Sequence, residues 1–494
     1  MSGIAGIWGR ADQEGVKQML EAQMHRGPHG RGLWTSPGGR CALGHDRLAI
    51  DRDEEQPVGT EDGTLWAVLD GELYNRETLR RRLEGRCRFR TGTDAELILH
   101  LFAQEGPDCL RHLDGVFALA IWKEGDGLYL ARDPLGVKPL YFGLDDQGHL
   151  CFASEIKALT DRVQEIRTLS PGSCRLPDGT VITFYTLPEP RAEVTDPEQA
   201  VRAVEQTLRQ AVRKRLAAGG TVGVLLSGGL DSSLIAAMVR QEVSGELHSF
   251  AVGLADSPDL RSARRVAEFL GTVHHERVLT PQEITAALPR VIRLLESCDP
   301  ALVRGSIANF FVAEEASRYV EAVLSGEGAD ELFAGYHYLA EWADQPHALS
   351  RELREITAAL HHTSLQRCDR MAQAHGLTIR IPFLDLEVVD LAFRIDPALK
   401  WQGGEGKRIL RRVAASYLPL EIAQRNKEKF AIGTGVAQVL ERYAASSAPG
   451  SWDGHPEEQL YWSIFRKWYG RQDILAQMGR SRSLNPTQRW VASI

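Results

Sequence analysis

The feature that most constrains the fold is an apolar run that opens into a loop of glycines and serines. Residues 222–226 are apolar, as expected for a strand covered on both faces. The next residues are Ser227-Gly228-Gly229-Leu230-Asp231-Ser232-Ser233, and a helix through Met238 follows. The glycines let the backbone approach a phosphate, and the free N–H groups at the start of the helix favour an anion. No Gly-Lys-Ser/Thr sequence follows, so the pattern predicts a nucleotide phosphate site that is not a Walker loop.

The rest of the second half alternates strands with helices. Further strands are expected at 249–253 and 322–325, and the second of these ends at Gly326-Glu327-Gly328. This alternation predicts a parallel α/β sheet whose ligands lie at the carboxyl ends of its strands. After about residue 350 the pattern is mostly helical.

The first half is typical of short strands bounded by turns. Apolar runs at 65–69, 117–122 and 128–131 stop at Gly and Asp residues, the first of them at Asp70-Gly71. A helix is expected at 94–104. A proline- and charge-rich stretch, 187–197, precedes a helix that Thr195 or Asp196 can cap and that Gly219-Gly220 ends. We therefore expect two domains, 1–187 and 196–494.

Composition excludes several classes of protein. The 494 residues include 58 basic and 66 acidic side chains, a net charge of −8, which argues against a nucleic-acid partner. No apolar run approaches the length of a membrane span, and the first residues lack the layout of a secretory signal. The 7 cysteines are scattered without a CxxC pair, which indicates free thiols rather than a disulfide framework or a zinc site. We expect a cytoplasmic protein.

Several motifs lie in one order along the chain: HRGP at 25–28, LGHDRLAI at 43–50, GELYN at 71–75, ARD at 131–133, FASEIKAL at 152–159, SGEGADE at 325–331 and PFLD at 382–385. With these motifs, the chain from residue 1 to about 440 resembles glutamine-hydrolysing asparagine synthetase, and SGGLDSS resembles the pyrophosphate loop of N-type ATP pyrophosphatases. The resemblance implies an N-terminal Ntn-hydrolase domain of the class II glutamine amidotransferase type, an αββα sandwich. It also implies a C-terminal parallel α/β domain that forms amides with ATP and Mg²⁺, with ammonia passing between the two. Relatives often form homodimers.

The glutaminase half departs from the family at two positions. The resemblance implies a mature N-terminus at residue 2, with a Cys nucleophile whose own α-amine is the base. This chain has Ser2, and a hydroxyl is far harder to deprotonate than a thiol of pKa about 8.5. The family has Asn where this chain has Asp70, and a carboxylate cannot donate to the oxyanion of the reaction. By resemblance, Arg47 holds the glutamine carboxylate, and Gly71, Glu72 and Asp94 hold its backbone and amine.

Three interpretations of Ser2 stay open. The glutaminase has degenerated into a scaffold, or it works slowly through Ser2, or Ser2 is an engineered replacement of a natural Cys. The last interpretation leaves Asp70 unexplained. We favour a degenerate glutaminase.

The residues that bind ATP match the family better. By resemblance, Lys427 neutralises charge as pyrophosphate leaves, and Glu327 and Asp330 lie near the amino group of the acyl substrate and the attacking nitrogen. One of these carboxylates can accept a proton from the nucleophile. Asp231 and Asp330 are the expected Mg²⁺ ligands. The residues expected to hold the nucleotide are Leu226, Ser227, Gly228, Gly229, Asp231, Ser232, Val252, Ser325 and Gly326.

The acid pocket is altered. In the family, two threonines lie shortly before an arginine that binds the acid. This chain keeps Arg304 but has Ala301 and Leu302 in place of the threonines, and Thr378 stands where relatives usually have Glu. A site that loses polar contacts usually loses its polar substrate. We therefore expect a bulkier or less polar acid than aspartate, in a specialised pathway.

Four functions stay open at this point. The first is an ATP-dependent ligase that adenylates a small-molecule carboxylic acid and transfers ammonia, an amine or glutamine nitrogen to it. The second is ordinary asparagine synthetase. The third is an intramolecular ligase of the β-lactam synthetase or lasso-peptide cyclase type, although Glu327 stands where the β-lactam enzymes have tyrosine. The fourth is an inactive sensor of glutamine or nucleotide, which the complete phosphate loop disfavours.

Overall fold

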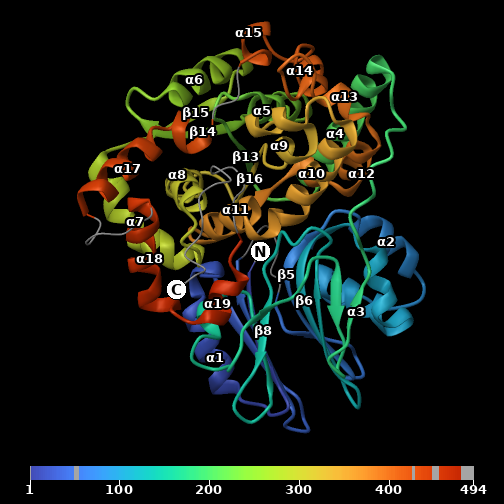
Figure 1. Cartoon of the computed structure of the whole chain (residues 1–494). Helices are drawn as coiled ribbons and strands as arrows, with labels where there is room; N and C mark the ends of the chain where they lie inside the picture. Colours follow the sequence, from blue (N-terminus) through green and yellow to red (C-terminus); the bar gives the residue numbers. More distant parts are fainter. Residues whose placement is uncertain (1, 49–54, 426–428, 448–454, 480–494) are drawn as a thin grey trace. The chain divides into compact units, whose positions relative to one another are not determined.

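The computed structural model describes residues 2–48, 55–425, 429–447 and 455–479 (Figure 1). The chain packs as two compact units. The first runs to Thr186 and includes Gln373–Gly376 and Trp468–Met478. The second begins at Leu187 and includes all the other described residues. Among the described residues, no helix is long and apolar enough to cross a membrane.

The first unit is built on two antiparallel sheets of six strands each. One has the order β10-β8-β9-β1-β3-β2 and the other β12-β11-β7-β6-β5-β4. The strands are β1 (Gly3–Trp8), β2 (Gly30–Thr35), β3 (Cys41–Arg47), β4 (Val58–Gly59), β5 (Leu65–Leu73), β6 (Gly115–Lys123), β7 (Gly127–Arg132), β8 (Tyr141–Leu144), β9 (Leu150–Ala153), β10 (Arg167–Thr168), β11 (Ser173–Arg175) and β12 (Val181–Thr183).

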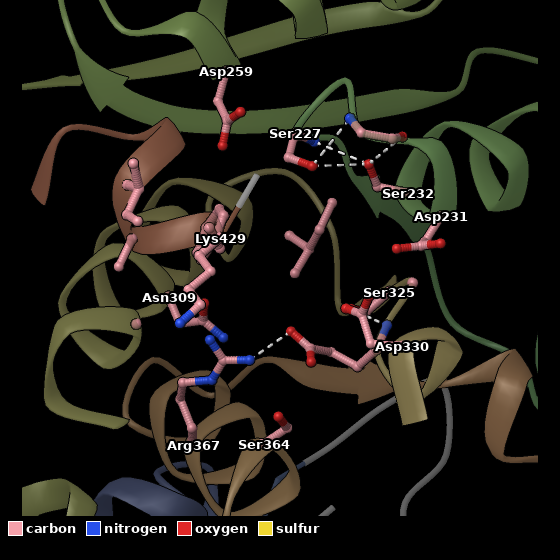
Figure 2. A pocket seen from close by; sticks show the side chains of 18 of the residues that line it. Ser227, Asp231, Ser232, Asp259, Asn309, Ser325, Asp330, Ser364, Arg367 and Lys429 are labelled. Atoms are coloured by element: carbon pink, nitrogen blue, oxygen red, sulfur yellow. Dashed lines mark hydrogen bonds and ion pairs between the residues drawn. The ribbon is translucent and has the colours of Figure 1, made fainter. Parts of the chain in front are cut away.

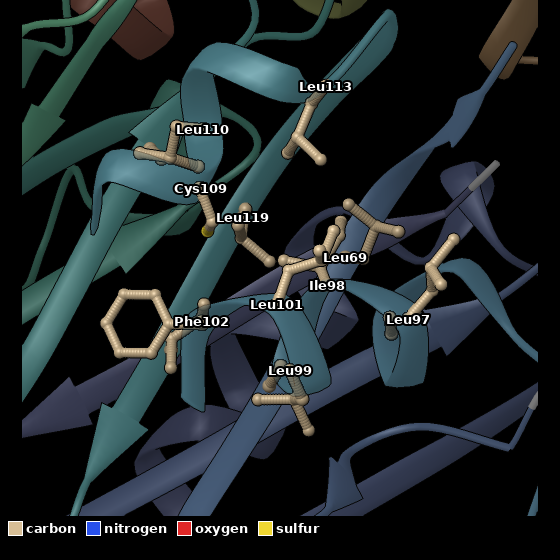
Figure 3. Close-up of a cluster of buried hydrophobic side chains, with 14 of the residues drawn as sticks. Leu69, Leu97, Ile98, Leu99, Leu101, Phe102, Cys109, Leu110, Leu113 and Leu119 are labelled. Carbon is tan, nitrogen blue, oxygen red and sulfur yellow. The ribbon is translucent and has the colours of Figure 1, made fainter. Parts of the chain in front are cut away.

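Apolar side chains hold these layers together. Ile4 and Phe152 of the first sheet pack with Val68 and Ala118 of the second in one buried cluster. On its other face the second sheet packs against α3 (Asp94–Glu105), as Figure 3 shows for Ile98, Leu101 and Phe102, and α2 (Arg76–Leu83) packs on α3. Helix α1 (Gln13–Ala22) covers β1 and β3. These four layers confirm the predicted αββα sandwich.

Strand β5 corrects one expectation. Asp70 and Gly71 do not form a turn, because β5 continues through them to Leu73. Asp70 pairs with Ala118 and Gly71 pairs with Phe117 of β6. The register of a buried neighbouring strand overrides the local turn preference of Asp-Gly, and it places Asp70 in the interior, where its side chain is fully buried.

The second unit contains the predicted parallel sheet. Its order is β15-β14-β13-β16-β17, with β13 (Val222–Leu225), β14 (His248–Leu254), β15 (Val273–Leu279), β16 (Ala322–Leu324) and β17 (Thr378–Arg380). Helices α5 (Leu230–Glu242), α6 (Pro258–Leu270) and α8 (Pro300–Ala316) pack on it. Because β13 lies between β14 and β16, the chain order reverses beside it, and ligands bind at such a point in open α/β sheets.

One of the remaining helices begins at the cap that the sequence predicts. Helix α4 (Pro197–Ala217) begins where expected, because the Asp196 side chain accepts a hydrogen bond from the backbone N–H of Gln199. The others are α7 (Pro281–Leu295), α9 (Ala329–Phe333), α10 (Pro346–Ala358), α11 (Ser364–Gln373), α12 (Leu386–Arg394), α13 (Pro397–Lys400), α14 (Arg408–Ala414), α15 (Leu420–Ala423), α16 (Phe430–Gly433), α17 (Val436–Ser447), α18 (Pro456–Tyr469) and α19 (Gln472–Gln477).

Candidate active sites

The glycine loop after β13 leads directly into α5. Gly228 has a φ of 68°, a conformation that glycine adopts without steric cost. The Ser227 and Ser232 hydroxyl oxygens lie 3.0 Å apart, and the Ser227 hydroxyl accepts from the Gly229 backbone N–H at 3.3 Å (Figure 2). These bonds shape the loop around the start of α5, whose first N–H groups are available to an anion. The geometry is that of a phosphate-binding loop.

This loop lines a cavity of about 310 Å³ in the second unit (Figure 2). Nearly all sequence-predicted ligase residues meet there, with Gly228 outside the lining. Lys427 lies outside the described residues. The predicted residues that line the cavity are Leu226, Ser227, Gly229, Asp231, Ser232, Val252, Ala301, Leu302, Arg304, Ser325, Gly326, Glu327 and Asp330.

Lysine 407 joins the two expected metal ligands. Its Nζ lies 2.6 Å from Asp231 Oδ2 and 2.5 Å from Asp330 Oδ1. All three residues line the cavity, and the lysine is almost fully buried. Asp231 and Asp330 thus lie close enough to share one cation.

A group of carboxyls follows β16. Glu327 accepts from the Arg367 guanidinium at 2.7 Å. The Tyr336 hydroxyl donates to Glu331 at 2.5 Å. Burial, together with the charges of Asp330 and Glu327, raises the pKa of Glu331 to about 7. In this group, one carboxyl, that of Glu331, therefore titrates near neutral pH, and its neighbours Glu327 and Asp330 are paired with cations.

Arginine 304, the expected clamp for the acid, is engaged inside the protein. Its Nε donates to Glu457 at 2.9 Å, and its Nη2 lies 2.8 Å from Glu441. The Glu457 side chain is fully buried and also accepts from the Tyr461 hydroxyl at 2.7 Å. The Arg304 guanidinium still lines the cavity beside Ala301 and Leu302, but its charge is already balanced.

A second constellation surrounds Ser2 in the first unit. The Ser2 backbone N–H donates to Asp70 Oδ1 at 2.9 Å, and Arg26 Nη2 donates to Asp70 Oδ2 at 2.8 Å. Arg26 also contacts Glu155 at 3.2 Å, and Lys138 Nζ lies 3.8 Å from Asp70. All five residues are buried. Both carboxylate oxygens of Asp70 therefore accept hydrogen bonds from within the protein, and one of these bonds comes from the backbone of residue 2.

The expected glutamine pocket is also occupied by internal bonds. Asp94 accepts from Arg76 Nε at 2.6 Å and from the Leu73 backbone N–H at 2.9 Å. Glu72 accepts from the Tyr74 hydroxyl at 3.1 Å, and Arg47 donates to the His29 carbonyl at 3.3 Å. Asp94 is thus already paired with a cation where the sequence expects it to hold the glutamine amine.

Several lining residues escaped sequence reasoning. Lys407, Arg367 and Tyr336 lie in no motif that we singled out, and Glu331 was quoted only as the last residue of SGEGADE. The spacing of Glu327 and Glu331, four residues apart in one short segment, was the available signal. Arg367 reaches the site from α11 and Lys407 from the start of α14, so only the tertiary fold assigns them.

Comparison with known proteins places both units in one family. A glutamine amidotransferase domain model matches residues 1–172, and an asparagine synthase model matches residues 203–352 and 341–473. An asparagine synthetase [glutamine-hydrolyzing] 1 from Arabidopsis thaliana is 36% identical over 90% of this chain and 81% of its own length. Asparagine synthetase B [glutamine-hydrolyzing] from Escherichia coli (strain K12) is 38% identical over 85% of this chain and 79% of its own length.

These matches agree with the two folds and with the phosphate loop. The first unit has the Ntn-type glutamine amidotransferase fold, and the second has the ATP pyrophosphatase-like fold of a domain that uses ATP. The chain therefore belongs to the asparagine synthetase family and is a carbon–nitrogen ligase.

Proposed function

We propose that this chain is a cytoplasmic ligase that adenylates a carboxylic acid other than aspartate, with release of pyrophosphate, and then transfers ammonia or an amine to it. We further propose that its N-terminal unit does not hydrolyse glutamine at a useful rate. The observation that carries the proposal is that one chain combines an intact phosphate loop with an altered acid pocket and an altered glutaminase site.

The ligase chemistry rests on the cavity. A carboxylate oxygen of the acid attacks the α-phosphorus of ATP. The bond between this phosphorus and the oxygen that bridges to the β-phosphorus breaks, pyrophosphate leaves, and an acyl-adenylate forms. The nitrogen then attacks the acyl carbon, AMP leaves, and the nitrogen gives up a proton. Glu327, Asp330 and Glu331 all line the cavity, and one of these carboxylates accepts this proton.

Asp231 and Asp330 both line the cavity and would hold a Mg²⁺ ion there, because Mg²⁺ is commonly bound by one or two carboxylates. Such an ion supplies charge neutralisation to the phosphates. Lys407 holds the two carboxylates in place, and the Ser227 and Ser232 hydroxyls and the first N–H groups of α5 orient the phosphate chain.

The altered acid site supports a substrate other than aspartate. Ala301 and Leu302 present methyl groups to the cavity, and the charge of Arg304 is balanced by Glu457 and Glu441. A second carboxylate on the substrate gains less from an arginine that is already paired than from a free one. We therefore propose an acid with an apolar body beside the reacting carboxylate.

The loss of glutaminase activity rests on Asp70 and Asp94. The buried Asp70 carboxylate, which accepts from the residue 2 N–H, has no hydrogen-bond donor to offer the oxyanion of the reaction. The pairing of Asp94 with Arg76 removes the carboxylate that would bind the glutamine amine. The two departures from the family, Ser2 and Asp70, each weaken glutamine hydrolysis, and the internal pairing of Asp94 weakens glutamine binding further.

The test is pyrophosphate release from ATP and Mg²⁺ with a panel of carboxylic acids, each with saturating ammonium or with glutamine. We expect release with ammonium and an acid that is less polar than aspartate, with the amide identified by mass spectrometry. Glutamine is expected not to replace ammonium. Asparagine formed from aspartate at the highest rate of the panel contradicts the proposed acid, and turnover with glutamine contradicts the loss of glutaminase.

Asparagine synthesis is the second candidate, because the relatives that carry that name match most of this chain. The same assay decides between the two. A preference for aspartate over every apolar acid establishes this candidate.

A further inference from the structure

We propose that Lys407 is a phosphate-positioning residue of the ligase, a role that rests on the proposed function of the second unit. Its ammonium fixes Asp231 and Asp330 beside the phosphate loop and faces the triphosphate of ATP. No sequence motif that we singled out contains this lysine.

The first support is its position. Asp231 is the second residue of α5, so an ammonium 2.6 Å from its carboxylate lies beside the helix N-terminus where the loop gathers N–H groups. The same ammonium is 2.5 Å from Asp330, in the first turn of α9. Figure 2 shows these two carboxylates on one side of the cavity. An ammonium has three donors, so contact with two carboxylates leaves one for a phosphate oxygen.

The second support is the backbone around the lysine. Lys407 has φ 58° and ψ 26°, a left-handed conformation that costs free energy for a residue with a side chain. Such a conformation persists only where the surroundings enforce it, and it concentrates at functional sites. A Cβ on Gly335 would lie 2.3 Å from Lys407 Cε and 1.9 Å from Asp330 Oδ1. Only a glycine at position 335 therefore leaves room for the lysine beside Asp330.

The third support is the charge balance. The ammonium of Lys407 cancels part of the negative charge of the two carboxylates. Without the lysine, the full charge of both carboxylates would repel a triphosphate. Removing Lys407 would leave both carboxylates facing the phosphate loop without this cation. The contribution expected of one hydrogen bond to a charged group corresponds to a change of about 10- to 100-fold in affinity.

The experiment measures ATP and AMP binding to the full chain by calorimetry, with Mg²⁺ and without any acid, so that no turnover occurs. For Lys407→Met we expect ATP to bind about 10- to 100-fold more weakly and AMP to change less than about 3-fold, since AMP lacks the two outer phosphates. Lys407→Arg keeps the charge and is expected to recover part of the ATP affinity.

Lys400→Met is the matched control. Lys400 is also buried, but it lies outside the cavity lining, with its Nζ 5.9 Å from the Phe333 ring centroid. We expect this variant to bind both nucleotides like the unmodified chain. Thermal melting of every variant shows which of them are folded.

Several other results of these binding measurements would overturn the inference. Equal losses of ATP and AMP affinity in Lys407→Met, or no loss, overturn the inference. The double variant Lys407→Met/Asp330→Asn keeps the net charge unchanged and serves where the single variant does not fold. Full ATP affinity in that double variant shows that Lys407 only balances charge, and it also overturns the inference. If the unmodified chain binds ATP while Lys407→Met binds it equally well, the proposed ligase function survives, whereas no ATP binding by the unmodified chain refutes both.

Discussion

The environment of Ser2 predicts how glutaminase activity responds to two substitutions. Ser2→Cys supplies the missing thiol but leaves Asp70 Oδ1 2.9 Å from the nitrogen of residue 2. Adding Asp70→Asn converts one of the two acceptor oxygens into an NH₂ donor of the same shape. Arg26 retains Glu155 at 3.2 Å, so the substitution does not leave a buried guanidinium unpaired.

The magnitude follows from the two roles of Asp70. One oxyanion donor contributes roughly 10²–10³ in rate, or about 2.7–4 kcal/mol. The charge of Asp70 is already compensated by Arg26 at 2.8 Å and Lys138 at 3.8 Å, so we assign no further electrostatic factor to its removal. We expect Ser2→Cys/Asp70→Asn to release glutamate about 10²–10³ times faster than Ser2→Cys alone.

The assay is enzymatic detection of glutamate, with kcat/KM compared because the Arg76–Asp94 pair is expected to keep KM for glutamine high. The control is Asp70→Asn with Ser2 retained, which lacks the thiol and should stay near the unmodified chain. Equal activity of the Ser2→Cys variant with and without Asp70→Asn refutes the reasoning, provided that thermal melting shows both to be folded. Rapid glutamine hydrolysis by the unmodified chain refutes it as well.

Three further predictions concern stability and reactivity. Arg304→Met leaves the fully buried Glu457 without its guanidinium partner and should lower the free energy of unfolding, measured in urea, by about 3 kcal/mol. The double variant Arg304→Met/Glu457→Met should recover most of that loss. Equal losses in the two variants contradict the ion pair between Arg304 and Glu457. Burial lowers the pKa of Lys400 to about 7. Between that pH and about 10.5 the unfolded chain therefore binds more protons than the folded chain, and the free energy of unfolding should rise by up to about 1.4 kcal/mol per pH unit. Lys400→Met should remove this slope. None of the 7 cysteines forms a disulfide, and only Cys87 is partly exposed. A thiol reagent should therefore modify Cys87 first in the native chain and all 7 cysteines in guanidinium. Equally fast modification of a second cysteine in the native chain contradicts the burial of that side chain.

Sequence reasoning predicted both folds and many of the residues that line the cavity of the second unit, because the relevant signals are local. A strand, a glycine loop and a helix start lie within 20 consecutive residues, and no distant contact is needed to place Ser227, Asp231 and Ser232 together. The cap of α4 was equally readable, since Asp196 and Pro197 act on the backbone next to them. The altered residues Ser2, Asp70, Ala301 and Leu302 were also visible as departures from a recognised pattern.

The end of β5 shows where local signals fail. Asp70-Gly71 has the composition of a turn, but pairing along β6 continues the strand and buries the Asp70 carboxylate. Its partners Ser2 and Arg26 are 68 and 44 residues away in the chain. No pattern in sequence order predicts which of two oxygens faces which donor.

The sequence alone therefore determined the class of fold, the nucleotide loop and the sites of divergence, because each depends on neighbours in the chain or on recognisable motifs. Only the tertiary structure decided how charge is balanced at those sites. Lys407 meets Asp231 across 176 residues, and Arg304 meets Glu457 across 153. How the charge of a buried carboxylate is balanced depends on these distant partners, which no local pattern in the sequence identifies.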